Sequence, residues 1–422
     1  MIYSFLNKLN KIEKFPYFIC TPIPYCIGTA SEQWLIAIKQ ASILKKKVII
    51  IVPTILQKIL KYKIFNDYFF NELKVVELTK KDKLFKSVFK ILINSQFLFN
   101  RIITLFLDKF TNVKVSESFR FPEIGIFYNI KKKVNFDEIK LPQHKVHEVN
   151  LSKNANIYCL KKMQEIGIGK EDSFVCVHVR DNMYRNDQGR REFRNSDISN
   201  YKEAILYLLK KNYWVIRIGQ LSNKRLEIDH PKFIDYPFSQ FKDYCLDLYL
   251  IKNCKFLICS QSGMHALASL FNKPILLTNA VRLFPTDSSA NNFSRTISKK
   301  PFWKKNKKLI PLENYLKLKY VHHHINFIDS EIDFEENSSS EILDATKEFL
   351  EPIEKKLDFK SKPNQIYFRD FILNSIKDHY YDTGDKNGEY LINVPEVFSM
   401  IIVLKESKEL YCSFFLEKYF RF

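Results

Sequence analysis

The sequence predicts an α/β protein built from two Rossmann-like parallel-sheet domains that face each other across a cleft. Short, nearly continuous apolar runs alternate with helical patterns of about 10 to 15 residues. This alternation occurs in both halves of the chain, and a charged segment without periodicity lies between them. These three observations favour two similar units over one continuous sheet.

The composition is that of a large, basic globular protein. Its 422 residues are 46% hydrophobic and 15% aromatic, which is enough to bury a sizeable core. The formal net charge of +20 implies attraction to polyanions such as nucleic acid, anionic lipid or phosphorylated substrates, although compositional bias of the genome would give the same excess. The eight cysteines have no metal-binding spacing and are expected to be reduced thiols of a cytosolic protein.

In the first half, two apolar runs predict strands and two periodic runs predict helices. The strands are expected over residues 15–24 and 47–53, and the helices over residues 30–46 and 54–70. Gly28 precedes the first helix, where it would allow a tight turn or the close approach of a ligand to the backbone.

The domain linker is expected within residues 129–153, which are charged, lack periodicity and include Pro142. The chain then divides into an N-terminal α/β domain, a C-terminal Rossmann-like domain, and a helical extension that packs back on both. The expected bounds of these three parts are residues 1–150, 151–300 and 301–422.

The segment Val88–Leu107 is rich in Phe, Ile and Leu and is flanked by lysines and arginines. We expect one or two helices packed inside the first domain, with a helix lying on an anionic membrane surface as the alternative. The N-terminus shows no export signal, and no run of about 18 apolar residues occurs. The expected location is therefore cytoplasmic, at most peripheral to the inner face of the membrane.

In the second half, polar residues gather where the predicted strands end. Strands are expected over residues 174–180, 213–219, 232–237, 256–261 and 274–280. Ligands of open parallel sheets bind outside the carboxyl ends of the strands, at the point where the strand order reverses. The polar residues at these ends are His178, Arg180, Asp181, Arg217, Gly219, Ser260, Gln261, Ser262, Gly263, Thr278 and Asn279.

Ser262 and Gly263 also open a helical pattern, so their backbone N–H groups and the helix dipole would form an anion site with Ser262 or Ser260 as the N-cap. Arg180 would add a planar, bidentate ligand. This group suits a phosphate or pyrophosphate. Ordinary helix capping, and a salt bridge of Arg180 to a neighbouring aspartate, are the alternatives.

The loop Asp181–Asp197 is longer than a strand-to-helix connection requires, and long loops at this end of a sheet are usually functional. A solvated charged loop is the alternative. His178 could equally be a core histidine, and His265 could face either the helix N-terminus or the sheet. The arginines of the loop are Arg185, Arg190, Arg191 and Arg194.

Several motifs resemble bacterial glycosyltransferases of the GT-B fold. They are HVRD at residues 178–181 with the Arg-rich loop after it, FRNSDISNY at 193–201, VIRIG at 215–219, SQSGMHALASLFNKPILLTN at 260–279 and, more weakly, IGTASEQW at 27–34. The H-x-R element is similar to that of GDP-fucose-dependent fucosyltransferases, but Asp181 stands where their second arginine would be.

The resemblance implies a nucleotide-diphosphate sugar as donor, bound by the domain of residues 151–300, with the acceptor on the side of residues 1–150. It makes Arg180 a ligand of the donor diphosphate and places Ser262, Gly263 and His265 in the same pocket. The full set of candidate donor-binding residues is Arg180, Arg217, Gly219, Ser260, Ser262, Gly263, His265, Gly28 and Arg194.

The expected reaction is transfer of a hexosyl or deoxyhexosyl group to a glycan or lipid-linked acceptor, in the biosynthesis of a bacterial surface polysaccharide such as lipopolysaccharide. The departing diphosphate gains negative charge, which the helix N-terminus, Arg180 and Arg217 would stabilise. The candidate catalytic residues are Asp181, Glu32 and His178, and Asp187 is a further candidate base.

No metal and no other cofactor is expected. The pairs Asp382/Asp385 and Glu331/Asp333 do not follow strong apolar strands, and three consecutive histidines cannot easily share one metal on a regular element. The histidines are His322, His323 and His324.

Two other function classes remain open. A basic nucleic-acid-binding module would spread Lys and Arg with aromatics over one face, whereas the arginines here cluster at strand ends, which makes nucleic acid an unlikely partner. Another nucleotide-utilising α/β enzyme, such as an NAD-dependent one, would be expected to carry G-x-G-x-x-G, which is absent.

Beyond the second domain, two features stand out. The basic run Lys299–Lys308 could contact phospholipid or nucleic acid, with a solvated loop as the alternative. Residues 338–351 predict a helix with Ser338 as N-cap and Glu341 three residues later.

Overall fold

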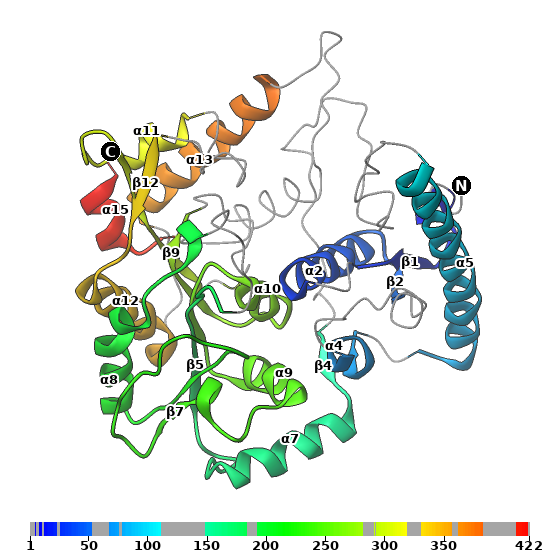
Figure 1. Ribbon diagram of the computed structural model, residues 1–422, viewed down its shortest axis with the longest axis horizontal. Coiled ribbons are helices and arrows are strands. Elements are labelled where there is room, and N and C mark those ends of the chain that lie inside the picture. The colour runs from blue at the N-terminus through cyan, green and yellow to red at the C-terminus, as the bar shows by residue number, and fades with distance from the viewer. Residues whose placement is uncertain are drawn as a thin grey trace.

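The computed structural model describes the chain as two α/β units placed side by side, the N-terminal unit on the right in Figure 1 and the C-terminal unit on the left. The expected linker falls mainly in residues 111–147, outside the described part. The described residues are 5, 8–10, 12–22, 26–52, 67–75, 78–110, 148–183, 192–281, 291, 293–318, 331–356, 362–382 and 411–420.

The C-terminal unit is built on a six-stranded parallel sheet with the order β7-β6-β5-β8-β9-β10. The α/β class with a Rossmann-like parallel sheet is thus confirmed, and five of the six strands are those expected. The strands are β5 (Phe174–His178), β6 (Trp214–Arg217), β7 (Phe233–Asp235), β8 (Leu257–Ser260), β9 (Ile275–Ala280) and β10 (Arg295–Ser298).

Alternate residues of β5 point to opposite faces of the sheet and belong to two separate hydrophobic clusters, because side chains alternate along a strand. Val175 and Val177 pack on the face covered by α8 (Lys202–Lys210) and α12 (Ser339–Lys355). Phe174 and Cys176 pack on the opposite face, with α7 (Lys153–Glu165), α9 (Tyr244–Asn253) and α10 (Gly263–Leu270). Because both faces are covered, the strands are apolar throughout rather than alternating. Short 3-10 turns, η2 (Glu192–Arg194), η3 (Ile198–Tyr201) and η4 (Tyr236–Phe238), join these elements.

Taken in chain order, the six strands follow the doubly wound order 3-2-1-4-5-6. The chain runs from β5 outward to β7, returns through α9, and continues from β8 to β10 on the other side. The order therefore reverses between β5 and β8, and their carboxyl ends mark the expected ligand position.

The N-terminal unit contains a smaller parallel sheet. Strands β1 (Tyr17–Cys20) and β2 (Lys47–Ile50) pair in parallel and are connected by α2 (Ile27–Ile43). Next come α4 (Asp67–Glu72) and β3 (Leu73–Lys74), which pairs antiparallel with β4 (Asn150–Leu151). Of the helix expected over residues 54–70, only the last residues are described, and they belong to α4.

The apolar segment expected as one or two packed helices is a single helix of 31 residues, α5 (Lys80–Phe110). One face packs on β1 and β2 through Phe89, Ile93 and Phe97. By length and composition alone this helix could also cross a membrane. Its other face is exposed.

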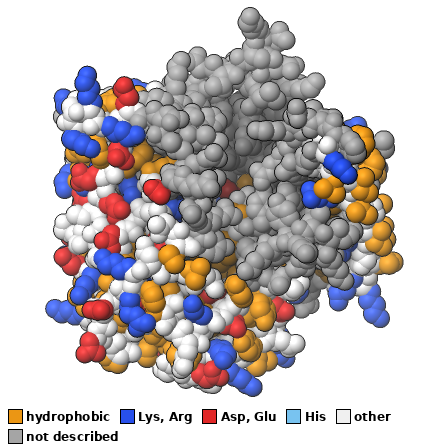
Figure 2. Space-filling model, viewed as in Figure 1, with side chains coloured by type: hydrophobic (Ala, Val, Ile, Leu, Met, Phe, Trp, Pro, Cys, Tyr) orange, Lys and Arg blue, Asp and Glu red, His pale blue; other side chains and the backbone are white. Residues whose placement is uncertain are grey.

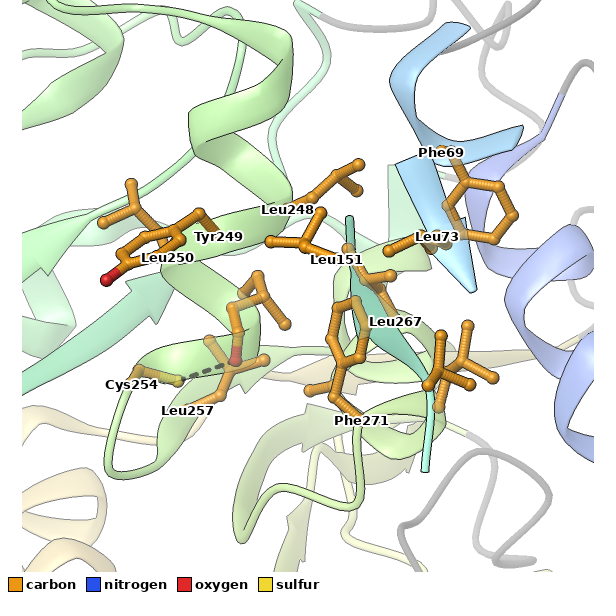
Figure 3. Close-up of a cluster of buried hydrophobic side chains, with 14 of the residues drawn as sticks. Phe69, Leu73, Leu151, Leu248, Tyr249, Leu250, Cys254, Leu257, Leu267 and Phe271 are labelled. Atoms are coloured by element: carbon orange, nitrogen blue, oxygen red, sulfur yellow. Dashed lines mark hydrogen bonds between the residues drawn. The ribbon is translucent and has the colours of Figure 1, made fainter. Parts of the chain in front are cut away.

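The two units share one hydrophobic core. Helix α2 packs along α10, and Ala30 and Trp34 of α2 belong to the same buried cluster as Leu267 of α10. A second contact lies beside it, where Phe69 and Leu73 of the N-terminal unit approach Leu151, Leu248, Leu267 and Phe271 (Figure 3). The units therefore meet in a packed contact along these helices.

The extension after β10 covers one face of the C-terminal sheet. The strands β11 (Lys300–Trp303) and β12 (Ile332–Glu335) pair antiparallel, and α11 (Leu312–Leu316), α12, α13 (Pro363–Asp382) and α15 (Ser413–Tyr419) pack nearby. Phe349, Phe368 and Phe415 join the core of this face. Helix α12 begins at Ser338 with the expected capping box.

The start of the basic run 299–308 differs from the expectation of a surface segment. Lys299 and Lys300 are only 4% and 7% exposed. The Nζ of Lys300 lies 2.6 Å from Glu335 and 3.1 Å from Glu341, so its charge is paired with two carboxylates of the same chain. The reason is that residues 300–303 form a paired strand rather than a loop.

Candidate functional site

The ends of β5 and β8 are joined by side-chain hydrogen bonds. The backbone N–H of Arg180 donates to Ser260 Oγ over 2.8 Å. The hydroxyl of Ser262 lies 3.2 Å from His178 Nδ1. Four residues predicted from strand ends are thus brought together at the point where the strand order reverses.

Helix α10 begins at this point with a capping box. Ser262 Oγ accepts from the N–H of Met264 over 3.3 Å, and the N–H of Ser262 donates to His265 Nδ1 over 2.9 Å. His265 takes the place that Glu or Gln usually has in this motif, and it therefore faces the helix N-terminus. The positive end of the helix dipole is directed at the same place.

His178 is held as a neutral hydrogen-bond donor. Its pKa is lowered to about 4, mainly by burial; Asp181 raises it, and Arg217 and His265 contribute to lowering it. Because Ser262 Oγ already accepts from Met264, its own hydrogen can go to His178 Nδ1. In that arrangement the ring proton is on Nε2 at neutral pH, which suits hydrogen bonding to an anion better than proton abstraction.

Three basic side chains lie in or beside the 192–196 segment, next to this turn. The Nη1 of Arg180 donates to Asn195 Oδ1, and Arg194 Nη2 donates to the carbonyl of Gln261 over 3.1 Å. The Nζ of Lys299 donates to the Asn195 carbonyl over 2.6 Å. Burial lowers the pKa of Lys299. The positive charge of Arg180 also lowers it, because the two cations repel each other. Glu336 lies 3.5 Å from Lys299 and offsets part of this charge.

Lys299 is a site residue that the sequence did not reveal. It follows directly after β10, so the same strand-end rule would have identified it. However, the strand reads Arg-Thr-Ile-Ser, with one large apolar residue, and gives a weak strand signal.

Arg217 is directed away from the group formed by Arg180, Arg194 and Lys299. It is 2% exposed, and its Nη1 donates to the Lys224 carbonyl over 2.7 Å and to Asp235 Oδ1 over 3.2 Å. Its Nη2 bonds to Ser222. The guanidinium therefore holds the loop after β6. Gly219 in that loop has a φ of +148°, a conformation that favours glycine.

Asp181 ties two loops together. Its Oδ2 accepts from Ser222 Oγ over 2.7 Å and from the N–H of Asn223 over 3.0 Å, and its Oδ1 accepts from the N–H of Met183 over 3.0 Å. This carboxylate is committed to loop structure. The other predicted residues of this loop, Arg185, Asp187, Arg190 and Arg191, lie outside the described residues.

Gly28 lies against Gly263, so the N-termini of α2 and α10 meet. A Cβ built on Gly28 would be 2.9 Å from Gly263 Cα, and a Cβ on Gly263 would be 3.0 Å from Gly28 N. The close approach expected at Gly28 is thus made by a second backbone. Glu32 lies four residues further along α2, on the same side of the helix as Gly28, and is half-buried.

Among the described residues, no three His, Cys, Asp or Glu side chains come close enough to share a metal ion. The three consecutive histidines and Asp385 are outside that part of the chain.

No protein-family model matches the sequence, and no curated protein matches it. Among solved structures, ADP-heptose lipopolysaccharide heptosyltransferase II of E. coli is 13% identical over 81% of this chain and 99% of its own, with a TM-score of 0.39. A family 9 glycosyl transferase from Veillonella parvula is 9% identical over 67% of this chain and 86% of its own, with a TM-score of 0.38.

The iron-containing dodecameric glycosyltransferase TibC of enterotoxigenic E. coli is 16% identical over 28% of this chain and 29% of its own, with a TM-score of 0.20. These scores are too low to assign a family or a reaction.

Proposed function

We propose that this chain is a glycosyltransferase that takes a hexosyl or deoxyhexosyl group from a nucleotide-diphosphate sugar. The observation that carries the proposal is the gathering of Arg180, Arg194 and Lys299 beside the N-terminus of α10. The group lies where the order of a doubly wound sheet reverses, which is the ligand position of such sheets. Three cations and a helix N-terminus suit a diphosphate better than a singly charged ligand.

The proposed chemistry is stabilisation of a leaving group. Departure of the sugar leaves added negative charge on the nucleoside diphosphate, and donors already fixed in place stabilise it without reorganisation. Arg180 and Lys299 would bind the phosphoryl oxygens, since both are held by Asn195 before any ligand arrives. His178 would donate from Nε2.

For the general base we propose Glu32. It comes from the N-terminal unit and lies one helical turn beyond the contact of Gly28 with Gly263, so an acceptor bound on that side would meet it. Asp181, the other carboxylate considered, accepts three hydrogen bonds within its own loops.

We further propose a glycan or lipid-linked acceptor in the assembly of a bacterial surface polysaccharide such as lipopolysaccharide, with the enzyme working at the cytoplasmic side of the membrane and without a metal. The net charge of +20 supports an anionic or membrane-borne partner.

The proposal is tested by a thermal-shift screen of the nucleoside diphosphates ADP, UDP, GDP, CDP and dTDP and of sugars linked to each of them. A donor present at about 100 times its Kd stabilises the protein by about 2.7 kcal/mol, which raises the Tm by several degrees. Mass spectrometry of the positive mixtures then detects release of the nucleoside diphosphate. A protein that responds to none of these compounds but binds oligonucleotides would contradict the proposal.

A further inference from the structure

Helix α5 has two apolar faces, and only one of them is covered by the protein. The inner face carries Phe89, Ile93 and Phe97, which pack on Tyr17 and Ile19 of β1 and on β2. Polar contacts hold the start of the helix in place, because Asp82 accepts from the hydroxyl of Tyr17 over 2.7 Å and pairs with Lys47 over 3.0 Å. The helix is therefore fixed lengthwise to the N-terminal sheet.

The outer face carries an apolar stripe that one exposed polar residue, Ser95, interrupts. On either side of Ser95 its members recur at spacings of three and four residues, so they line one side of the helix over about six turns, opposite the inner face. Their side chains are between 37% and 69% exposed. Figure 2 shows hydrophobic side chains along the right edge of the molecule, where Figure 1 places α5. The stripe consists of Leu84, Val88, Ile91, Leu92, Leu98, Phe99, Ile102, Leu105 and Phe106.

Basic side chains frame this stripe. Lys80, Lys81 and Lys83 are exposed at the start of the helix and Lys109 at its end, and three further cations lie along it at half-buried positions, Lys86, Lys90 and Arg101. The one acidic residue of α5 whose side chain is described, Asp82, is buried under the ion pair with Lys47. An apolar stripe with positive charge at its ends and edge matches a surface that is apolar inside and negative outside.

We infer that this stripe docks α5 onto an anionic membrane surface, with the helix axis parallel to the membrane plane. An amphipathic helix of this kind inserts its apolar face at the boundary between head groups and acyl chains while its lysines reach the anionic head groups. Spanning is disfavoured because α5 would have to leave β1 and β2 and expose Tyr17, Ile19 and Ile49. A second copy is disfavoured because pairing along the stripe would bring two sets of lysines together.

The inference stands apart from the proposed transferase activity, since it depends on α5 and not on the strand ends. If both hold, the donor site belongs to an enzyme held at the membrane, where a lipid-linked acceptor would be available.

The test is sedimentation of the full chain with vesicles of phosphatidylglycerol and phosphatidylcholine, compared with phosphatidylcholine alone. The protein should bind the anionic vesicles, and raising the salt from about 0.05 to 0.5 M should weaken binding on the order of tenfold or more. The triple substitution Ile91→Gln, Ile102→Gln and Phe106→Gln should weaken it on the order of a hundredfold, because each removes a side chain that would be buried in lipid.

The control is the triple substitution Ile157→Gln, Leu206→Gln and Leu221→Gln, which alters exposed hydrophobic residues elsewhere on the surface, 45% to 52% exposed against 58% to 66% for the three residues of α5. It should bind like the unaltered protein. Absence of binding at low salt, or equal binding by the α5 variant and the control, would overturn the inference. So would resistance to extraction with alkaline carbonate, which indicates a spanning helix, or a dimer in lipid-free solution that the α5 variant dissociates.

Discussion

Asn195 organises the cations of the candidate site through two different atoms. Its side-chain oxygen accepts from Arg180, and its backbone carbonyl accepts from Lys299. Both cations are thereby oriented by one residue of a short turn, which limits how far they can separate despite their repulsion. A dianionic ligand would relieve that repulsion, and the energetic gain would appear as affinity.

Replacement of Lys299 by Met should reduce affinity for nucleoside diphosphates by one to two decades, since one charge-assisted bond contributes roughly 1.5 to 3 kcal/mol. Titration calorimetry measures this directly. Lys300→Met is the control, because Lys300 is as deeply buried but pairs with Glu335 and Glu341 away from the strand ends. The control should lower the Tm and keep the affinity; equal losses of affinity in both variants would contradict the assignment of Lys299.

Asp247 makes the free energy of unfolding depend on pH, and its raised pKa determines the sign of that dependence. Burial raises its pKa to about 7, and its Oδ1 has no hydrogen-bond partner in the described structure. The folded protein therefore keeps a proton on Asp247 between about pH 4 and 7, where the unfolded chain has lost it, so this group makes the stability fall as pH rises through that window.

Asp247→Asn should remove this contribution. The difference in unfolding free energy between the variant and the unaltered protein should change by roughly 2 kcal/mol from pH 5 to pH 7, in favour of the variant at the higher pH. His178, whose pKa of about 4 has the opposite effect, is present in both proteins and cancels. Urea unfolding at several pH values measures the difference, and a flat difference would refute the prediction.

At the scale of elements, α2 and α10 determine how the two units meet. Their first turns touch at Gly28 and Gly263, and a side chain at Gly28 would collide with the backbone of Gly263 rather than with a flexible group. The contact places the N-termini of both helices beside the strand ends of the C-terminal sheet, and Glu32 follows one helical turn along α2. Ala30 and Trp34 continue the packing along α2.

Gly28→Ala should destabilise the protein by roughly 1 to 3 kcal/mol, the usual cost of inserting a methyl group into a filled contact. Gly169→Ala is the matched control, because the nearest atom to its new Cβ, at 3.2 Å, belongs to the side chain of Asp172, which can move. Thermal and urea unfolding should separate the two; equal stability of both variants would mean that the helices are not in close contact at Gly28.

The elements also show what the sequence could and could not predict. The strands β5 to β9 were predictable because each is apolar and bounded by helices or turns, and the strand-end rule then identified His178, Arg180, Ser260 and Ser262 together. The contact of Gly28 with Gly263 joins segments that are far apart in the chain, and no local pattern encodes it. The sequence of α5 left packing inside the domain and contact with a membrane both open, because which face of the helix the protein covers depends on β1 and β2.

The hydrogen-bond partners of the strand-end arginines could not be predicted from the sequence either. Arg217 and Arg180 both follow the apolar part of a parallel strand, and the sequence treats them alike. Asp235, on the neighbouring strand β7, draws Arg217 into the loop after β6, whereas Asn195 holds Arg180 at the strand ends. Such choices depend on the strand neighbours, which only the three-dimensional structure supplies.

At the scale of the whole molecule, the donor site and the membrane-facing helix belong to different units. The strand ends lie in the C-terminal unit, and α5 lies at the far edge of the N-terminal unit (Figure 1). The shared core around α2, α9 and α10 connects them. In this account the N-terminal unit holds the enzyme at the membrane and presents Glu32, while the C-terminal unit binds the donor.

The most direct test of this account is the affinity of Arg180 variants for the nucleoside diphosphate identified by the donor screen, measured by calorimetry together with the Tm of each protein. Loss of two charge-assisted bonds in Arg180→Ala should weaken binding by roughly two to four decades, with the Tm nearly unchanged. Arg180→Lys should recover part of the affinity, since an ammonium keeps the charge but loses the planar fork. If Arg180→Ala instead lowers the Tm and binds the nucleotide as tightly as the unaltered protein, Arg180 serves the fold through Asn195, and the donor site is not at these strand ends.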